Sequence, residues 1–332
     1  MKVFVTGAEG FIGSHLVEKL VEKKYKVTAH YLYNFSDSMG WINSVKGNLL
    51  NKVKIVKGDI RDIQLIRRLI KGNDIVINLA ALIGIPYSYT AIKSYYDTNL
   101  YGTLNLLEVA KDLKIKHFIQ TSTSEVYGTA RYVPMNEKHP LNAQSPYAAS
   151  KIASDQLAIS FYNSFNFPVT IIRPFNTFGP RQSLRAIIPT IISQMSKEKS
   201  KILVGNIFPK RDFNFVEDIC EAFIKTINNK RSFGETINIG SSTNISVKEL
   251  IKMIANNMGK KNYVIKSKND RKRSKNSEVE NLLCDNKKAK KILNWKPKYQ
   301  GKQGFLEALK RTIDWYRKKE NKKFFDNTKF VI

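Results

Sequence analysis

The sequence predicts an α/β protein: a doubly wound parallel sheet with a smaller mixed α/β lobe toward the C-terminus. Short apolar runs alternate with longer amphipathic stretches through the first half of the chain, which is typical of β-α-β units. A glycine-rich turn, Gly7-Ala-Glu-Gly-Phe-Ile-Gly13, lies between the first apolar run and the first amphipathic stretch. The alternation changes after Gly179-Pro180, which indicates the second lobe.

The expected elements follow from this pattern. In the sheet region we expect strands at 2–6, 27–31, 53–57, 74–78, 117–121, 169–173 and 236–239, and helices at 14–23, 63–70, 98–113, 147–164 and 218–228. In the smaller lobe we expect helices at 187–196, 247–258, 286–293 and 304–319, strands at 202–204 and 211–216, and a basic loop at 268–277. Ser246 and Glu249 form a capping-box pattern before one of these helices.

We therefore expect two units. A dinucleotide-binding domain of the Rossmann type comprises residues 1–178 and 212–243, and a substrate-binding lobe comprises 179–211 and 244–332.

Composition narrows the class of protein. The chain has 332 residues and 42% hydrophobic content, which is enough for a large core. No apolar stretch reaches the roughly 20 residues that span a bilayer, and the first strand begins too early for a signal peptide. The two cysteines, Cys220 and Cys284, make neither a disulfide framework nor a metal site. We expect a cytoplasmic protein that needs no membrane and no metal.

The net charge of +28 raises the question of a polyanionic partner. The lysines are scattered, and their densest runs alternate with apolar residues on expected helices. We interpret the charge as solvated basic faces and expect no nucleic-acid partner.

The glycine-rich turn predicts a dinucleotide site, because glycines let the backbone approach a pyrophosphate that the following helix N-terminus attracts. The acid that often ends the second strand and holds the ribose of NAD is missing: the chain reads Tyr31-Leu-Tyr-Asn34, with no arginine either. The strand end therefore leaves the choice of cofactor open; NAD is expected and NADP is not excluded. The residues expected to hold the cofactor are Gly7, Gly10, Phe11, Ile12, Gly13, Asp59, Ile60, Leu79, Ala80, Ala81, Tyr147 and Lys151.

Tyr147 and Lys151 lie four residues apart and share one face of an expected helix, which Ser145 can cap. A tyrosine has an ordinary pKa of about 10, and a neighbouring cation favours its phenolate. The run Thr123-Ser-Glu125 follows the fifth strand and adds hydroxyls that can bind the same substrate oxygen. Together these groups can take a proton from an alcohol while a hydride leaves its carbon.

With these motifs assembled, the chain resembles the extended short-chain dehydrogenases/reductases of the nucleotide-sugar epimerase/dehydratase type, from Met1 to about Tyr316. The motifs that carry the resemblance are Gly7-x-x-Gly10-x-x-Gly13, Asn78-Leu-Ala-Ala81, Thr123-Ser-Glu-Val-Tyr-Gly128, Tyr147-x-x-x-Lys151, Arg173-Pro-Phe-Asn-x-Phe-Gly-Pro-Arg181 and Arg211-Asp-Phe213. Residues 81–89 and 121–130 look closest to LegB-type 4,6-dehydratases of legionaminic acid biosynthesis, which act on GDP-linked N-acetylglucosamine.

The resemblance implies a role for each catalytic residue. Tyr147 takes the proton of the sugar 4-hydroxyl, Thr123 shares the hydrogen bond to that oxygen, and Lys151 holds the nicotinamide ribose. Glu125 removes the C5 proton while water leaves C6, and hydride returns to C6, so a tightly bound cofactor is regenerated. Glucose-type dehydratases carry an aspartate where this chain has Ser124, so we hypothesise that Glu125 also protonates the leaving group.

The resemblance also implies substrate ligands and an assembly. The expected substrate-binding residues are Ser88, Asn176, Arg181, Arg211, Arg273 and Glu278. Among them, Arg211 and Arg273 are expected at the diphosphate, because arginine forks match phosphate oxygens. Members of this family usually pair through the two helices expected at 98–113 and 147–164, which predicts a homodimer.

Alternative functions remain open. A UDP-glucuronate decarboxylase shares Thr-Ser-Glu and would need a cation for the C6 carboxylate, for which Arg181 or Arg185 could serve. A 4-epimerase needs no base at the position of Glu125. A non-catalytic dinucleotide sensor with a nucleic-acid-binding surface would have no use for the complete catalytic set. The nucleotide base and the C2 substituent of the sugar are not determined by the sequence.

Overall fold

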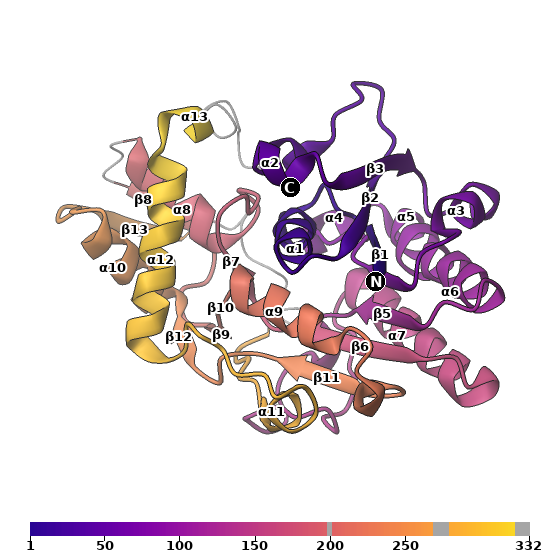
Figure 1. The fold of residues 1–332 in the computed structure, drawn as a ribbon. Coiled ribbons are helices and arrows are strands. Elements are labelled where there is room, and N and C mark those ends of the chain that lie inside the picture. Colours follow the sequence, from indigo (N-terminus) through magenta and orange to yellow (C-terminus); the bar gives the residue numbers. More distant parts are fainter. Residues whose placement is uncertain (198–200, 268–278, 323–332) are drawn as a thin grey trace.

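The computed structural model describes residues 1–197, 201–267 and 279–322. Its centre is a parallel seven-stranded sheet with the order β11-β6-β5-β4-β1-β2-β3 (Figure 1). The strands are β1 (Lys2–Thr6), β2 (Lys26–Leu32), β3 (Val53–Gly58), β4 (Ile75–Asn78), β5 (His117–Thr121), β6 (Val169–Pro174) and β11 (Thr236–Ile239). The direction of winding reverses between β1 and β4, and a crevice for ligands forms at such a switch point.

Helices cover both faces of this sheet (Figure 1). Those that pack around it are α1 (Phe11–Glu22), α3 (Ile63–Ile70), α6 (Gly102–Asp112), α7 (Pro146–Phe165) and α9 (Val216–Thr226). Alternate residues of β1 point into two separate cores, since Val3 and Val5 pack in the cluster with α1 and α9, whereas Phe4 packs in the cluster with α3, α6 and α7. The predicted doubly wound fold is confirmed.

The C-terminal part holds small two-stranded sheets, β10-β7, β12-β9 and β13-β8. Their strands are β7 (Thr177–Phe178), β8 (Lys201–Val204), β9 (Lys210–Asp212), β10 (Asn214–Phe215), β12 (Asn244–Ser246) and β13 (Val264–Ser267). The helices are α8 (Ile187–Ser196), α10 (Val247–Asn257), α11 (Lys287–Leu293) and α12 (Gly301–Arg317). α12, in yellow, lies on the opposite side of the molecule from α3 and α6 (Figure 1). The predicted capping box at Ser246 and Glu249 is present.

Short elements complete the described chain: α2 (Gly47–Leu50), α4 (Ile85–Ser88), α5 (Ile92–Tyr95), α13 (Lys319–Lys322), η1 (Gly40–Ser44), η2 (Tyr96–Tyr101), η3 (Ser124–Tyr127) and η4 (Lys230–Ser232). One hydrophobic cluster extends from the sheet through α9 to α12, with Phe178 packing on Phe305 at 5.2 Å between ring centroids. This cluster belongs to both the expected dinucleotide-binding domain and the expected substrate-binding lobe. The division of the chain into these two units stays a prediction.

The expected helix at 98–113 was wrong in its first turn. The chain there forms the π-helical turn η2 before α6 begins at Gly102. Asn99 lies in this turn, and its amide pairs with the backbone of Leu82, accepting from the N–H at 2.8 Å and donating to the carbonyl at 3.0 Å. This pairing holds the turn open, as is common for π-bulges near functional sites.

The expected strand at 211–216 was also too long. It is divided into β9 and β10, which pair with different partners. Asp212, at the end of β9, accepts hydrogen bonds from the backbone N–H groups of Ser241, Ser242 and Cys284. These bonds turn the chain away from a single strand. The basic loop expected at 268–277 lies outside the described residues.

Candidate active site

A cleft with a volume of about 520 Å³ lies at the carboxyl ends of the central strands. It is the size of an ordinary small-molecule site. Its walls come from the glycine-rich turn after β1, the ends of β2 to β6, and the first turns of η3 and α7. This is the place that the strand order indicates for a ligand.

The glycine-rich turn forms one end of the cleft. Gly7 has a φ of +63°, and a Cβ there would lie 2.8 Å from the backbone nitrogen of Ala80. A Cβ on Gly13 would lie 2.2 Å from the carbonyl oxygen of Gly7. Only glycine fits at these two positions, because the turn folds tightly onto itself and onto the end of β4. Helix α1 follows with Gly10 as its N-cap, which provides no side-chain cap, so the helix end can bind an anion.

All twelve residues expected to hold the cofactor line this cleft. Several buried polar atoms of the cleft have no hydrogen-bond partner among the described residues, among them Oγ1 of Thr121 and Oε2 of Glu9. A tight glycine turn, an uncapped helix end and unpaired polar atoms in one elongated cleft fit a dinucleotide such as NAD. The roles of the individual residues toward it stay predictions.

The five residues expected to be catalytic line the same cleft: Thr123, Ser124, Glu125, Tyr147 and Lys151. Thr123 follows β5 and caps η3, where its hydroxyl accepts a hydrogen bond from the N–H of Glu125 at 3.3 Å. Ser145 caps α7 and Pro146 begins it, as predicted, so Tyr147 enters the cleft from the first turn of that helix. Tyr147 and Thr123 form a side-chain hydrogen bond.

Burial controls the protonation of the two helix residues. It raises the pKa of Tyr147 well above 10; the hydrogen bond from Thr123 opposes this rise, and the Glu125 carboxylate adds to it. Burial lowers the pKa of Lys151 to about 8, while Asp155 opposes that shift. Lys151 donates a hydrogen bond to the carbonyl oxygen of Thr121 at 2.6 Å. The expected phenolate of Tyr147 is thus not favoured by the protein alone.

The low pKa of Lys151 predicts a pH dependence of stability in the cofactor-free protein. The folded-state pKa of about 8 lies below the usual 10.5, so between these pH values the unfolded chain binds more protons. Stability must therefore rise with pH across this window, by about 3 kcal/mol from this group. Urea unfolding should show this rise in the wild type relative to Lys151→Met, and parallel pH curves for the two proteins would contradict it.

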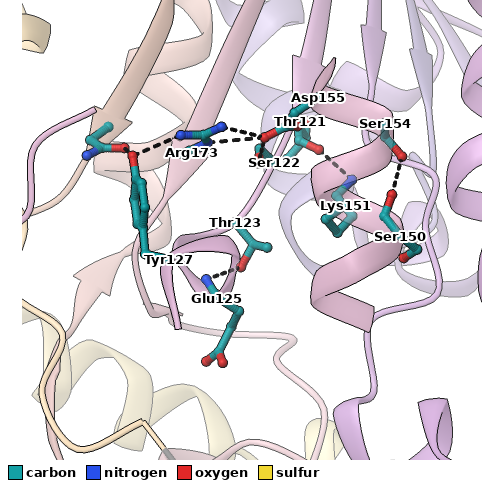
Figure 2. A network of polar contacts seen from close by, with 11 residues as sticks. Thr121, Ser122, Thr123, Glu125, Tyr127, Ser150, Lys151, Ser154, Asp155 and Arg173 are labelled. Carbon is teal, nitrogen blue, oxygen red and sulfur yellow. Dashed lines mark hydrogen bonds and ion pairs between the residues drawn. The ribbon is translucent and has the colours of Figure 1, made fainter. Parts of the chain in front are cut away.

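A buried polar network lies behind the catalytic residues (Figure 2). The Asp155 carboxylate accepts hydrogen bonds from Ser122 at 2.5 Å and from Arg173 at 2.9 and 3.1 Å. Arg173 also donates to the hydroxyl of Tyr127 at 3.0 Å, and Tyr127 donates to Asn238 at 2.7 Å. The network ties β5, β6, β11 and α7 together directly behind Thr123 and Lys151.

Neither Asp155 nor Asn99 was predicted from the sequence. Asp155 lies one helical turn after Lys151, a spacing that could have indicated it. Asn99 donates to Ser150 on α7 at 3.0 Å, and so joins η2 to the catalytic helix. This contact depends on the π-helical turn, for which the sequence carries no signal.

The expected substrate residues separate into groups. Asn176 lines the cleft, and its buried Oδ1 has no partner within the described residues. Arg211 is buried on β9, donates to the Lys210 carbonyl oxygen at 3.1 Å, and lies outside the lining of the cleft. Arg273 and Glu278 lie outside the described residues.

Two further residues expected at the substrate make other contacts. Ser88 is fully buried, and its hydroxyl donates to the carbonyl oxygen of Ile85 at 2.7 Å, so it closes a turn of α4 instead of facing the cleft. The Arg181 guanidinium donates to Glu18 of α1 at 2.8 Å and to the Ser44 carbonyl at 3.0 Å. Neither side chain lines the cleft.

Within the described residues, no group of three or more His, Cys, Asp or Glu side chains could hold a metal ion. Over the same ranges, no helix has the length and apolar character to cross a bilayer.

Comparison with known proteins gives consistent matches along almost the whole chain. The family model for GDP-mannose 4,6 dehydratase matches residues 4–308. A putative UDP-glucose 4-epimerase from Methanocaldococcus jannaschii is 32% identical over 95% of this chain and 98% of its own length. The human dTDP-D-glucose 4,6-dehydratase is 32% identical over 95% of this chain and 90% of its own length.

Solved structures agree with these matches. The crystal structure of DesIV, a dTDP-glucose 4,6-dehydratase from Streptomyces venezuelae with NAD bound, superimposes with a TM-score of 0.86. It is 26% identical in sequence, and the match covers 98% of this chain and 99% of DesIV.

Proposed function

Because the chain belongs to the extended short-chain dehydrogenase/reductase family of nucleotide-sugar epimerases and dehydratases, we propose that it is a nucleotide-sugar 4,6-dehydratase. GDP-N-acetylglucosamine is the proposed substrate, and a 4-keto-6-deoxy sugar for a bacterial surface glycan, of the kind that leads to legionaminic acid, is the proposed product. We further propose that the enzyme works as a cytoplasmic homodimer.

One observation carries the proposal: Glu125 lies in the cleft close enough to Tyr147 to raise the pKa of its hydroxyl. Oxidation at C4 needs only a group that accepts the hydroxyl proton, which is the role of Tyr147. Elimination needs a second base beside it, at the neighbouring carbon. Figure 2 shows the Glu125 carboxylate pointing away from the ion pair of Asp155 and Arg173.

The residues divide the chemistry as follows. Tyr147 accepts the proton of the 4-hydroxyl, and Thr123 holds the same oxygen. The 4-keto group then makes the C5 hydrogen acidic, and Glu125 removes it as the C6–O bond breaks. With Ser124 in place of an acid, Glu125 passes its proton to the departing hydroxide, so water leaves and the base is restored. C5 then takes a proton from solvent and Tyr147 releases the proton that it accepted, so the reaction removes one water molecule from the sugar.

The proposed cofactor is NAD, held by the glycine-rich turn, the start of α1 and Lys151. When bound, NAD would supply a hydride acceptor for oxidation at C4 and, once reduced, a hydride donor for C6. Its oxidised ring is positively charged, which would favour the Tyr147 phenolate that burial alone disfavours. The structure of the relative DesIV with NAD supports this proposal.

A 4-epimerase is the second candidate, because a relative described as a putative UDP-glucose 4-epimerase is as similar as the human dehydratase. The decarboxylase alternative is weakened, because Arg181 is held by Glu18. The other cation considered for the decarboxylase, Arg185, lies close to Gly84, because a Cβ on Gly84 would be 3.5 Å from the Arg185 Nη1. The neighbours of Gly84, Ile83 and Ile85, line the cleft.

Product analysis by proton NMR tests the proposal. Purified protein is incubated separately with GDP-N-acetylglucosamine, UDP-N-acetylglucosamine, GDP-mannose and UDP-glucuronate. We expect a new C6 methyl doublet in the first sample without consumption of added cofactor. A methyl doublet only in another sample would reassign the substrate, an epimeric hexose would favour the epimerase, and a pentose from UDP-glucuronate alone would establish the decarboxylase.

A further inference from the structure

The end of β2 lacks the acid that commonly binds the adenosine ribose of NAD, but the structure brings a carboxylate there from another element. Glu9 belongs to the glycine-rich turn, between Gly7 and Gly10. Its Oε1 accepts a hydrogen bond from the backbone N–H of Leu32, the last residue of β2, at 3.1 Å. The carboxylate thus lies at the strand end where the sequence Tyr31-Leu-Tyr-Asn34 has no acid.

The second carboxylate oxygen of Glu9 is available to a ligand. Glu9 lines the cleft together with His30, Leu32 and Asp59. Its Oε2 is buried and has no hydrogen-bond partner among the described residues. Burial of the carboxyl raises its pKa, although the Leu32 N–H opposes this rise. A buried carboxylate oxygen without a donor is costly, and a pair of hydroxyl groups would satisfy it.

The backbone holds Glu9 in this place. The Glu9 carbonyl oxygen accepts a hydrogen bond from the N–H of Trp41 at 2.9 Å. Gly40, with a φ of +52°, packs so closely that a Cβ on it would lie 2.8 Å from the same oxygen. The loop between β2 and β3 therefore packs against the backbone of the turn at Glu9.

Two cations near this end of the cleft, Arg61 and Lys57, are already paired. Arg61 lines the cleft, but its Nε lies 3.0 Å from each carboxylate oxygen of Asp59. Lys57 pairs with Asp37 at 3.1 Å. A 2′-phosphate that paired with either of these cations would have to break an existing ion pair, and it would do so next to the Glu9 carboxylate.

We propose that Glu9 binds the ribose hydroxyls of the adenosine half of NAD, in place of the missing acid after β2, and that it excludes NADP. This inference rests on the proposed dinucleotide cofactor but not on the sugar chemistry. The end of β2 alone does not decide between NAD and NADP. Glu9 would decide it, because its carboxylate accepts hydrogen bonds from the ribose diol of NAD and repels the 2′-phosphate of NADP.

A competition experiment with the full-length protein tests the proposal without an activity assay. Wild type and Glu9→Gln are exchanged to equilibrium against an equimolar mixture of NAD and NADP, desalted and extracted with acid, and the two dinucleotides are quantified. We expect the wild type to retain NAD over NADP by about a hundredfold, and Glu9→Gln to reduce this ratio by about tenfold or more. Glu22→Gln, on the exposed side of α1, removes the same charge and should leave the ratio unchanged.

An equal ratio in wild type and Glu9→Gln, or retention of NADP by the wild type, would overturn the proposal. If Glu9→Gln does not fold, the dinucleotide that copurifies with the wild type decides, because NADP there contradicts the role of Glu9 and NAD alone supports it. Failure to retain either dinucleotide would remove the proposed cofactor as well. An NAD preference that depends on Glu9, with no product from any nucleotide sugar, would refute only the dehydratase proposal.

Discussion

Replacing Glu125 by glutamine should leave oxidation at C4 detectable and slow the elimination of water by about a hundredfold to ten-thousandfold. Glutamine keeps the shape of the side chain and its backbone cap on Thr123, but it cannot accept the C5 proton. Tyr147, Thr123 and Lys151 are unchanged, so the first proton transfer still has its base. The variant should therefore accumulate reduced nicotinamide on the protein with nucleotide sugar present, without forming a C6 methyl group.

Absorbance of the reduced nicotinamide measures oxidation at C4, and NMR of the sugar measures formation of the C6 methyl group. Glu307→Gln, an exposed carboxylate on α12, serves as the control for charge removal and should behave like wild type. Normal product from Glu125→Gln would show that Glu125 is not the base for elimination. Normal 4-epimer formation in this variant would instead support the epimerase candidate.

Replacing Asp155 by asparagine should destabilise the protein by about 3–5 kcal/mol. Asp155 and Arg173 form an ion pair at 2.9 Å with side chains 0% and 4% exposed. Removal of the carboxylate charge leaves the Arg173 guanidinium buried without compensation. The substitution also weakens the acceptor of the Ser122 hydroxyl. The two neighbours of Ser122 hold catalytic side chains: Thr121 contacts Lys151, and Thr123 contacts Tyr147. The catalytic residues should therefore lose precise placement along with stability.

Urea unfolding gives the measurement, and a surface pair gives the control. Arg67 and Asp112 pair at 2.7 Å, but their side chains are 41% and 43% exposed. Asp112→Asn should cost less than about 1 kcal/mol, because water compensates the lost charge. The double variant Asp155→Leu with Arg173→Met should recover much of the loss, since it leaves no unpaired charge. Equal costs for Asp155→Asn and Asp112→Asn would contradict this account.

Local signals in the sequence were sufficient for the fold and for much of the cleft. Apolar runs bounded by turns predict each strand of the sheet to within one residue, because parallel strands buried on both faces are nearly continuous in apolar character. The Gly7–Gly13 turn and the Tyr147–Lys151 spacing act locally, through backbone freedom and helical periodicity. Residues placed by such features therefore meet in the cleft.

What the sequence could not predict depends on long-range contacts. Glu9 reaches Leu32 of the next strand, Asp155 meets Arg173 of β6, and Arg181 turns to Glu18 of α1. None of these pairs has a periodic signal in the chain. Arg181 was expected at the substrate because its charge suits an anion, but a buried arginine is equally well satisfied by a carboxylate of a neighbouring helix.

The fate of the C4 hydrogen tests the central proposal most directly. Nucleotide sugar deuterated at C4 is incubated with the protein in ordinary water, and the product is analysed by NMR and mass spectrometry. A 4,6-dehydratase that regenerates its cofactor should deliver the deuterium to C6, giving a methyl group that carries one deuteron. Deuterium that remains at C4 of a hexose whose C4 configuration is inverted would contradict the proposal and show that the enzyme is an epimerase.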